Sequence, residues 1–98
     1  MNILDEKMLK KVSRILKVLS EPTRISILYL LEDQELSVTE ISQTLDLEQS
    51  AVSHQLKTLK DARLVKGERQ GKKMIYSQLD RHVYEILNQV IEHAKEDE

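Results

Sequence analysis

The chain has 98 residues, 40% of them hydrophobic, with no Cys, Phe or Trp and a formal net charge of −2. This length predicts one domain spanning residues 1–98, and the lack of cysteine excludes disulfide bonds, thiolate metal sites and cysteine nucleophiles. No secretory hydrophobic region opens the sequence, and no apolar run approaches the roughly 20 residues that span a bilayer. We therefore expect a cytoplasmic protein with no membrane partner.

The N-terminal third of the sequence predicts two helices. Apolar residues recur with helical spacing over 4–19. Ser20 can cap a second helix, and Pro22 suits its first turn. This second helix is apolar on most sides as far as Leu31, so we expect it at the centre of the core. The first helix is expected to contact both its own core and a partner chain.

A helix-turn-helix pattern and a hairpin follow. Ser37 and Glu40 form a capping box, in which each side chain satisfies a free backbone N–H, so a short third helix is expected there. A brief turn leads to a fourth helix over about 49–61, with a polar face opposite its apolar positions. Residues 64–79 predict two short strands around Gly71. The expected fold is mainly α, a winged helix-turn-helix of about five helices with a two-stranded wing.

The fourth helix and the hairpin predict a surface for double-stranded operator DNA. Residues 49–73 hold seven basic and two acidic residues, a local balance of +5 in a chain that is negative overall. The start of the second helix of such a motif enters the major groove and needs short or hydrogen-bonding side chains. The side chains expected near bases are Gln49, Ser50, Ser53 and His54. Those expected along the phosphates are Lys57, Lys60, Arg69, Lys72 and Lys73. The alternative is an ordinary solvated surface helix, against which the capped helix and the basic hairpin argue.

The last helix, expected to begin at Asp80, carries two histidines. At 100° per residue, His82 and His93 fall on one side of it, at the border of an apolar and an acidic flank, but about 16 Å apart along the axis. Zinc–ligand bonds are near 2 Å, so one ion cannot bridge both within one chain. Two antiparallel copies would bring His82 of one chain beside His93 of the other, with Asp80 and Glu96 completing two N₂O₂ sites. Such a set suits tetrahedral zinc, with cobalt as a mimic. Two surface histidines without a metal are the alternative.

Four runs of sequence carry a family resemblance over about residues 8–96. They are LSEPTRISIL at 19–28, LEQSAVSHQLKTLK at 47–60, LV at 64–65 and RQGKKMIYS at 69–77. On these runs the chain resembles the ArsR/SmtB family of bacterial metal-sensing repressors. One departure is Glu48, where many relatives have a Ser or Thr cap, although a carboxylate there still suits the helix dipole.

The resemblance implies a zinc-responsive repressor that binds its operator as a metal-free homodimer and is released by zinc. Zinc sensors of this family bind metal between paired C-terminal helices, through Asp-x-His and a His followed three residues later by His or Glu. This chain has Asp80-Arg-His82 and His93-Ala-Lys-Glu96. The resemblance also suggests that the other nitrogen of His93 hydrogen-bonds backbone near the recognition helix. The cysteine site of relatives that sense arsenic, cadmium or lead is absent.

Several alternatives stay open from sequence. An acid beside Glu96, either Glu92 or Asp97, could supply the fourth ligand. The signal could be another divalent ion or none, although nickel would need N-terminal ligands and no histidine precedes His54. No phosphate loop or paired nucleophile and base indicates an enzyme. A purely dimerising protein would be recognised by its lack of DNA affinity.

Overall fold

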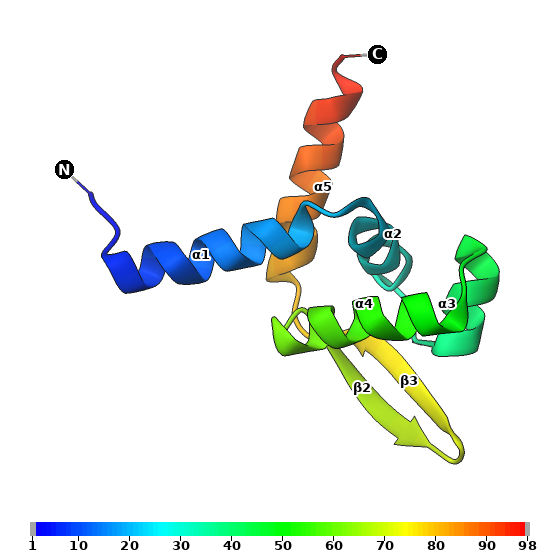
Figure 1. The fold of residues 1–98 in the computed structure, drawn as a ribbon. Coiled ribbons are helices and arrows are strands. Elements are labelled where there is room, and N and C mark those ends of the chain that lie inside the picture. Colours follow the sequence, from blue (N-terminus) through cyan, green and yellow to red (C-terminus); the bar gives the residue numbers. More distant parts are fainter. Residues whose placement is uncertain (1, 98) are drawn as a thin grey trace.

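A computed structural model describes residues 2–97 as five helices and three strands (Figure 1). In chain order they are α1 Glu6–Leu19, α2 Pro22–Leu30, β1 Leu36–Ser37, α3 Val38–Leu45, α4 Gln49–Asp61, β2 Val65–Gln70, β3 Lys73–Gln78 and α5 His82–Lys95. Helices α2, α3 and α4 pack with the sheet into one body, from which α1 and the end of α5 project in different directions. The winged helix-turn-helix prediction is confirmed.

The capping box predicted for α3 is present. The Ser37 hydroxyl accepts from the Glu40 N–H at 3.1 Å, and the Glu40 carboxylate accepts from the Ser37 N–H at 2.9 Å. That backbone bond holds the pKa of Glu40 below its usual range, and nearby Lys73 of the wing acts in the same direction. Each of these contacts favours a charged carboxylate at the start of α3.

The other helix starts differ in detail from the sequence prediction. Ser20 does not cap α2, because its hydroxyl turns back and donates to a carbonyl at the end of α1. Glu21 caps α2 instead, since its two carboxylate oxygens accept from the N–H groups of Thr23 and Arg24 at 2.9 and 3.1 Å. Helix α5 begins at His82, two residues after Asp80.

The sheet has three antiparallel strands in the order β1-β3-β2. The wing, β2 and β3, matches the predicted hairpin, and its tip pair is Gln70 with Lys73. Between them Gly71 has a φ of 64°, a left-handed backbone conformation that residues with a Cβ rarely adopt. The unpredicted strand β1 pairs Leu36 with Tyr76. Its two residues are too few to show an alternating pattern.

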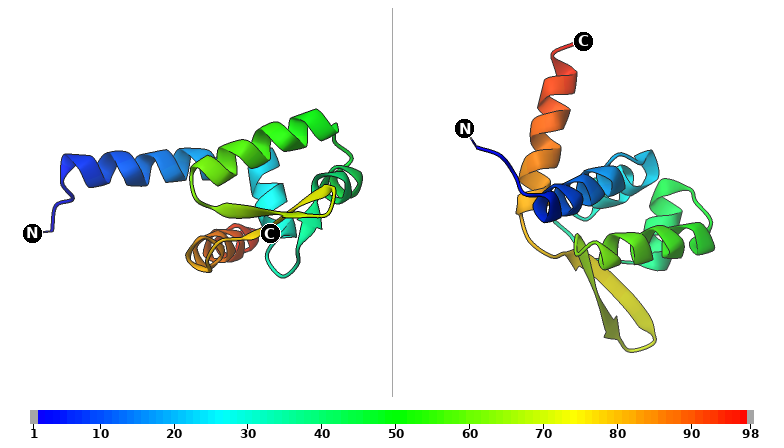
Figure 2. Two further views of the ribbon diagram at one scale, coloured as in Figure 1. Left: turned by 90° about the horizontal axis from the view of Figure 1, so that it is seen from below. Right: turned by 60° about the vertical axis from the view of Figure 1, so that its left-hand side comes forward.

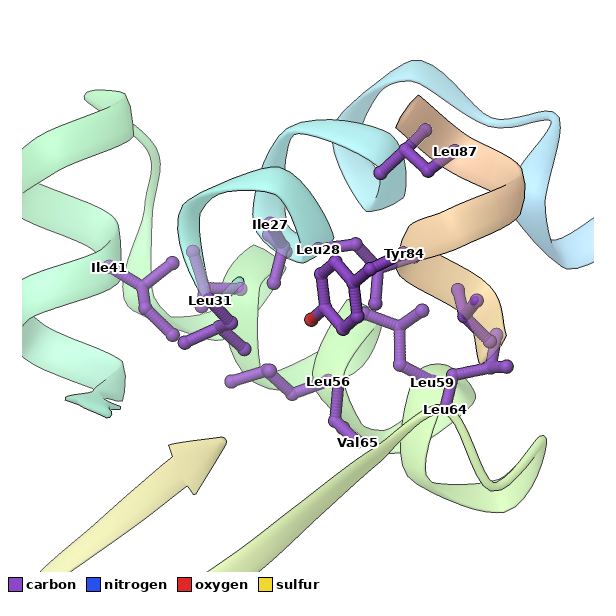
Figure 3. Close-up of a cluster of buried hydrophobic side chains, with 12 residues drawn as sticks. Ile27, Leu28, Leu31, Ile41, Leu56, Leu59, Leu64, Val65, Tyr84 and Leu87 are labelled. Carbon is purple, nitrogen blue, oxygen red and sulfur yellow. The ribbon is translucent and has the colours of Figure 1, made fainter. Parts of the chain in front are cut away.

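The core lies between α2, α4 and the start of α5 (Figure 3). The α2 side chains Ile27 and Leu28, with Leu31 just after them, are fully buried, which confirms the central place predicted for this helix. Figure 3 shows the Tyr84 ring pointing from α5 into this cluster. The ring is fully buried, and its hydroxyl has no hydrogen-bond partner among the described residues. Burial raises the pKa of Tyr84 to about 12.

Helix α1 lies mostly outside this core. None of its residues is buried, and only Val18 and Leu19, at its end, pack against the core. The radius of gyration is 14.8 Å, whereas a chain of this length ordinarily has about 12.6 Å. The accessible surface is 7328 Å², against about 5,800 Å² for a compact monomer of this mass. The expected contact with its own core is thus limited to the last turn, and a long apolar face of α1 has no cover in one chain. Across residues 2–97, no helix has both the length and the apolarity needed to cross a membrane.

Candidate DNA-binding surface and metal site

Helices α3 and α4 form the helix-turn-helix. Asp46 follows α3 with a φ of 56°, a left-handed conformation that Asp tolerates better than most residues and that turns the chain toward α4. Three buried side chains, Val52, Leu56 and Leu59, hold α4 on the core. Glu48 precedes α4 without making a side-chain cap hydrogen bond, so its contribution there is electrostatic. The opposite face of α4 is left free to solvent.

All nine residues predicted to contact DNA are exposed and lie on two adjacent elements. On α4 they are Gln49, Ser50, Ser53, His54, Lys57 and Lys60, and on the wing they are Arg69, Lys72 and Lys73. The Lys57 ammonium lies 3.2 Å from the Asp61 carboxylate, which offsets part of its charge. Within residues 2–97, Lys60 has no carboxylate within 4.0 Å. The arrangement offers hydrogen-bonding groups along one helix and cations along the helix and the hairpin.

One residue that positions α4 was missed from sequence. Arg24 of α2 donates from Nε to the Val18 carbonyl at 2.8 Å and from Nη1 to Gln55 Oε1 at 2.9 Å. It therefore joins the end of α1 to the middle of α4. The sequence did hold a signal for this residue, namely an arginine in a helix that is otherwise apolar on most sides. A half-buried guanidinium there needs hydrogen-bond acceptors.

A second missed residue, Glu32, joins α5 to the end of α2. Its carboxylate accepts from Asn88 Nδ2 at 3.1 Å and lies 3.4 Å from Arg81 Nη2. Its backbone carbonyl accepts from Gln78 Nε2 of β3 at 2.8 Å. Glu32 thus connects the wing and the histidine-bearing helix at one point. Arg81 lies directly between Asp80 and His82 in the sequence.

The predicted metal ligands lie as two separate pairs near opposite ends of α5. His82 Nδ1 is 3.2 Å from Asp80 Oδ1, and His93 Nδ1 is 3.8 Å from Glu96 Oε2. Both imidazoles are 85% exposed. Within residues 2–97, no three His, Asp or Glu side chains gather as a metal site requires. One chain therefore brings together each half of the predicted ligand set and not the whole.

The neighbouring acids are placed differently. Glu92, one of the alternative ligands, forms an ion pair with Lys95 instead, with 3.6 Å between Oε1 and Nζ. Glu96 is the acid that contacts His93. The third histidine, His54, is exposed on α4, on the helix face predicted to meet DNA.

Comparison with known proteins agrees with this geometry. A profile described as "Bacterial regulatory protein, arsR family" matches residues 21–66, which include the whole helix-turn-helix. The HTH-type transcriptional regulator NmtR of Mycobacterium tuberculosis is 39% identical over 92 residues, covering 94% of this chain and 77% of that protein. The chain belongs to the ArsR/SmtB family of metal-responsive transcriptional regulators. Its relatives are DNA-binding regulators and not enzymes, in agreement with the sequence analysis.

Other members of the ArsR/SmtB family are similar over most of the chain. The transcriptional repressor SmtB homolog of Synechocystis is 34% identical over 87 residues, 89% of this chain and 66% of that protein. The arsenical resistance operon repressor of Staphylococcus xylosus is 39% identical over 80 residues, 82% of this chain and 76% of that protein. The homodimeric winged helix-turn-helix domain of Mb0332 from Mycobacterium bovis superposes with a TM-score of 0.85 at 27% identity, covering 98% of this chain and 92% of that one.

Proposed function

We propose that the chain is a zinc-responsive repressor, whose metal-free homodimer binds operator DNA and is released when zinc occupies two sites between the subunits. The observation that carries this proposal is the pair of half-sites at the two ends of α5. Asp80 with His82 and His93 with Glu96 each offer one imidazole and one carboxylate, and each is incomplete alone. A complete four-ligand set needs a second copy of the helix.

The homodimer is supported by apolar surface that one chain leaves uncovered. Leu9 and Leu16 of α1 are 52% and 53% exposed, and Ile86 and Val90 of α5 are 47% and 60% exposed. Burying these faces between two copies would stabilise the dimer by about 25 cal/mol for each Å² of apolar surface removed from water. The structural relative described as homodimeric shares the fold over nearly the whole chain.

The donor set favours zinc among divalent ions. Two imidazole nitrogens and two carboxylate oxygens suit tetrahedral coordination, and cobalt is the expected mimic. The chain has no cysteine, so a thiolate site is excluded. A bound ion would join the two α5 helices by ligation from both. The proximity of His82 and of His93 to a carboxylate of the same chain supports this proposal.

The α5 helix is well placed to influence the DNA-binding elements. Glu32 ties it to the end of α2 and to β3 of the wing. Ligation that fixes α5 would therefore also restrict the wing and the core on which α4 lies. If zinc binds the free dimer more tightly than the DNA-bound dimer, operator affinity falls by the same factor.

A subunit-mixing experiment tests the shared site. His82→Asn and His93→Asn are each expected to abolish zinc binding in their own homodimers. When the two variants are mixed, a mixed dimer contains one site with both substitutions and one with neither. Mixed dimers should therefore regain one tight zinc site, measured by titration against a competing chelator. Ligands drawn from a single chain would give no recovery, and that result would overturn the proposal.

Operator binding is measured in the same preparations. The metal-free parent should bind operator DNA, and saturating zinc should weaken binding by about 10-fold or more, within the usual range of allosteric coupling. His93→Asn should bind DNA and ignore zinc. His54→Asn is the matched control for zinc binding alone, because it removes an exposed histidine and should keep zinc stoichiometry, but it lies on the α4 face predicted to meet DNA. Titrations with cobalt, nickel and cadmium identify the metal, and a response to one of these without a response to zinc would refute zinc sensing.

A further inference from the structure

Helix α1 carries a concentration of positive charge that the proposed function does not use. Between Glu6 and Leu19 there are five basic residues and one acidic residue, a balance of +4. The stretch from 49 to 73 has a balance of +5, so the rest of the chain, with three basic and fourteen acidic residues, has −11. A net positive charge is thus found in α1 and in the α4–wing segment, whereas the rest of the chain is net negative.

The basic residues of α1 form one stripe. They are Lys7, Lys10, Lys11, Arg14 and Lys17. At 100° per residue they occupy an arc of about 120°. Its centre lies about 160° from that of the apolar arc formed by Met8, Leu9, Val12, Ile15, Leu16 and Leu19, whereas Val18, which packs against the core, falls within the basic arc. Lys10 lies 4.0 Å from Glu6, and within residues 2–97 the other four have no carboxylate within that distance. Apart from Val18, the basic stripe and the apolar face are therefore centred on different sides of the helix.

The stripe continues the surface of the recognition helix. A groove of about 250 Å³ lies between α1 and the end of α4, lined by Lys11, Arg14, Ile15, Asp61, Ala62 and Arg63. Lys11 and Arg14 of the stripe therefore lie beside Arg63, close to the last turn of α4 that carries Lys60. The left view of Figure 2 shows α1 and α4 along one edge of the molecule and α5 at the opposite edge.

We propose that four cations of the basic stripe of α1, Lys7, Lys11, Arg14 and Lys17, form a second DNA-backbone contact, which binds phosphates between the two operator half-sites. This inference rests on the proposed dimeric DNA binding. Half-sites of helix-turn-helix dimers are about 34–36 Å apart, which leaves a central duplex segment that the recognition helices do not read. The apolar face of α1 meets the second copy, and the stripe on its other side faces the DNA.

The competing possibility is that the basic stripe of α1 binds the acidic flank of α5 in a second copy instead of DNA. The continuity of the stripe with Arg63 and α4 favours DNA, because phosphates beside the recognition helix lie within reach of the same surface. These two occupants predict opposite effects of removing the charges.

The first test measures the salt dependence of DNA binding by the metal-free protein. The triple variant Lys7→Gln, Lys11→Gln, Arg14→Gln should bind operator with a slope of log affinity against log salt that is smaller by up to about 5 per dimer, since each lost phosphate contact contributes about 0.9. Lys95→Gln, on α5, should leave the slope unchanged. An unchanged slope with a weakened dimer in sedimentation equilibrium would overturn the proposal in favour of the α5 contact.

The second test locates the stripe on the DNA. The chain has no cysteine, so Lys11→Cys provides a single attachment point for an iron–EDTA reagent. Strand cleavage should fall at the operator centre, between the half-sites, whereas Lys95→Cys should give none there. Absence of central cleavage by a labelled protein that still binds the operator would overturn the proposal. A parent protein with no operator affinity would instead refute the proposed function.

Discussion

Arg24 and Gln55 are separated by 31 positions in the chain, and a 2.9 Å hydrogen bond from the Arg24 guanidinium to the Gln55 amide oxygen joins them. The same guanidinium holds the Val18 carbonyl at 2.8 Å. This contact links the end of α1, the core helix α2 and the recognition helix α4. The setting of α4 therefore depends on a residue that lies outside the helix-turn-helix.

Replacement of this guanidinium should destabilise the protein. Arg24→Met leaves two half-buried acceptors without donors, so the free energy of unfolding should fall by about 1–3 kcal/mol. Urea denaturation at one fixed protein concentration measures the change, because dimer stability depends on concentration. Lys10→Met, at an exposed position of α1, is the control and should change stability by less than about 0.5 kcal/mol. Equal stability of the two variants would show that the Arg24 bonds contribute nothing.

Tyr84 should make stability fall at alkaline pH. The unfolded chain releases the phenol proton near pH 10, whereas the folded chain keeps it until about pH 12. The stabilisation is therefore complete below pH 10 and is lost between pH 10 and 12, by about 2–3 kcal/mol. Tyr84→Phe should remove this part of the pH dependence. At neutral pH it should also match or exceed the parent by about 1 kcal/mol, because it deletes a buried hydroxyl without a partner.

The wing should not tolerate a side chain at Gly67. A Cβ placed there would lie 2.9 Å from Tyr76 Cε1 and 3.3 Å from the Met74 methyl carbon. Gly67→Ala should therefore push the Tyr76 ring aside and lower stability by about 1–3 kcal/mol. Thermal unfolding measures this loss, and the ring resonances of Tyr76 should shift with it. Gly71→Ala meets no atoms within 4 Å, so it should cost only the strain of its φ of 64°, about 1 kcal/mol.

A charge on the apolar face of α1 should separate the proposed dimer. Leu16 is 53% exposed in one chain, and a carboxylate buried between copies would carry a desolvation penalty of several kcal/mol. Leu16→Glu should sediment as a monomer at concentrations where the parent is dimeric. Gln43→Glu adds the same charge on α3 and should remain dimeric. If Leu16→Glu is dimeric as well as Gln43→Glu, the dimer interface does not include this face of α1.

Local patterns in the sequence were sufficient for most of the fold. The capping box at Ser37, the polar face of α4 and the hairpin around Gly71 each depend on residues within one or two turns of chain. The separation of His82 and His93 also followed from helix geometry alone, because both lie on one helix.

Contacts across the fold were not accessible in this way. The bonds from Arg24 to Gln55 and from Asn88 to Glu32 connect residues 31 and 56 positions apart, and no local periodicity encodes such pairs. Strand β1 is equally non-local, since its two residues form a strand only because β3 lies beside them. The proposed metal site would be a further case, because its two halves would meet only through the packing of two molecules.

The lack of buried residues in α1 also affects how this helix behaves in a lone protomer. Few tertiary contacts hold its backbone hydrogen bonds closed, so its amide protons should exchange with solvent quickly, as they do in regions of low local stability. Pairing would slow that exchange throughout the helix. In the proposed dimer, the order of the N-terminal segment would therefore depend on protein concentration, and proteolysis within α1 would selectively remove monomers.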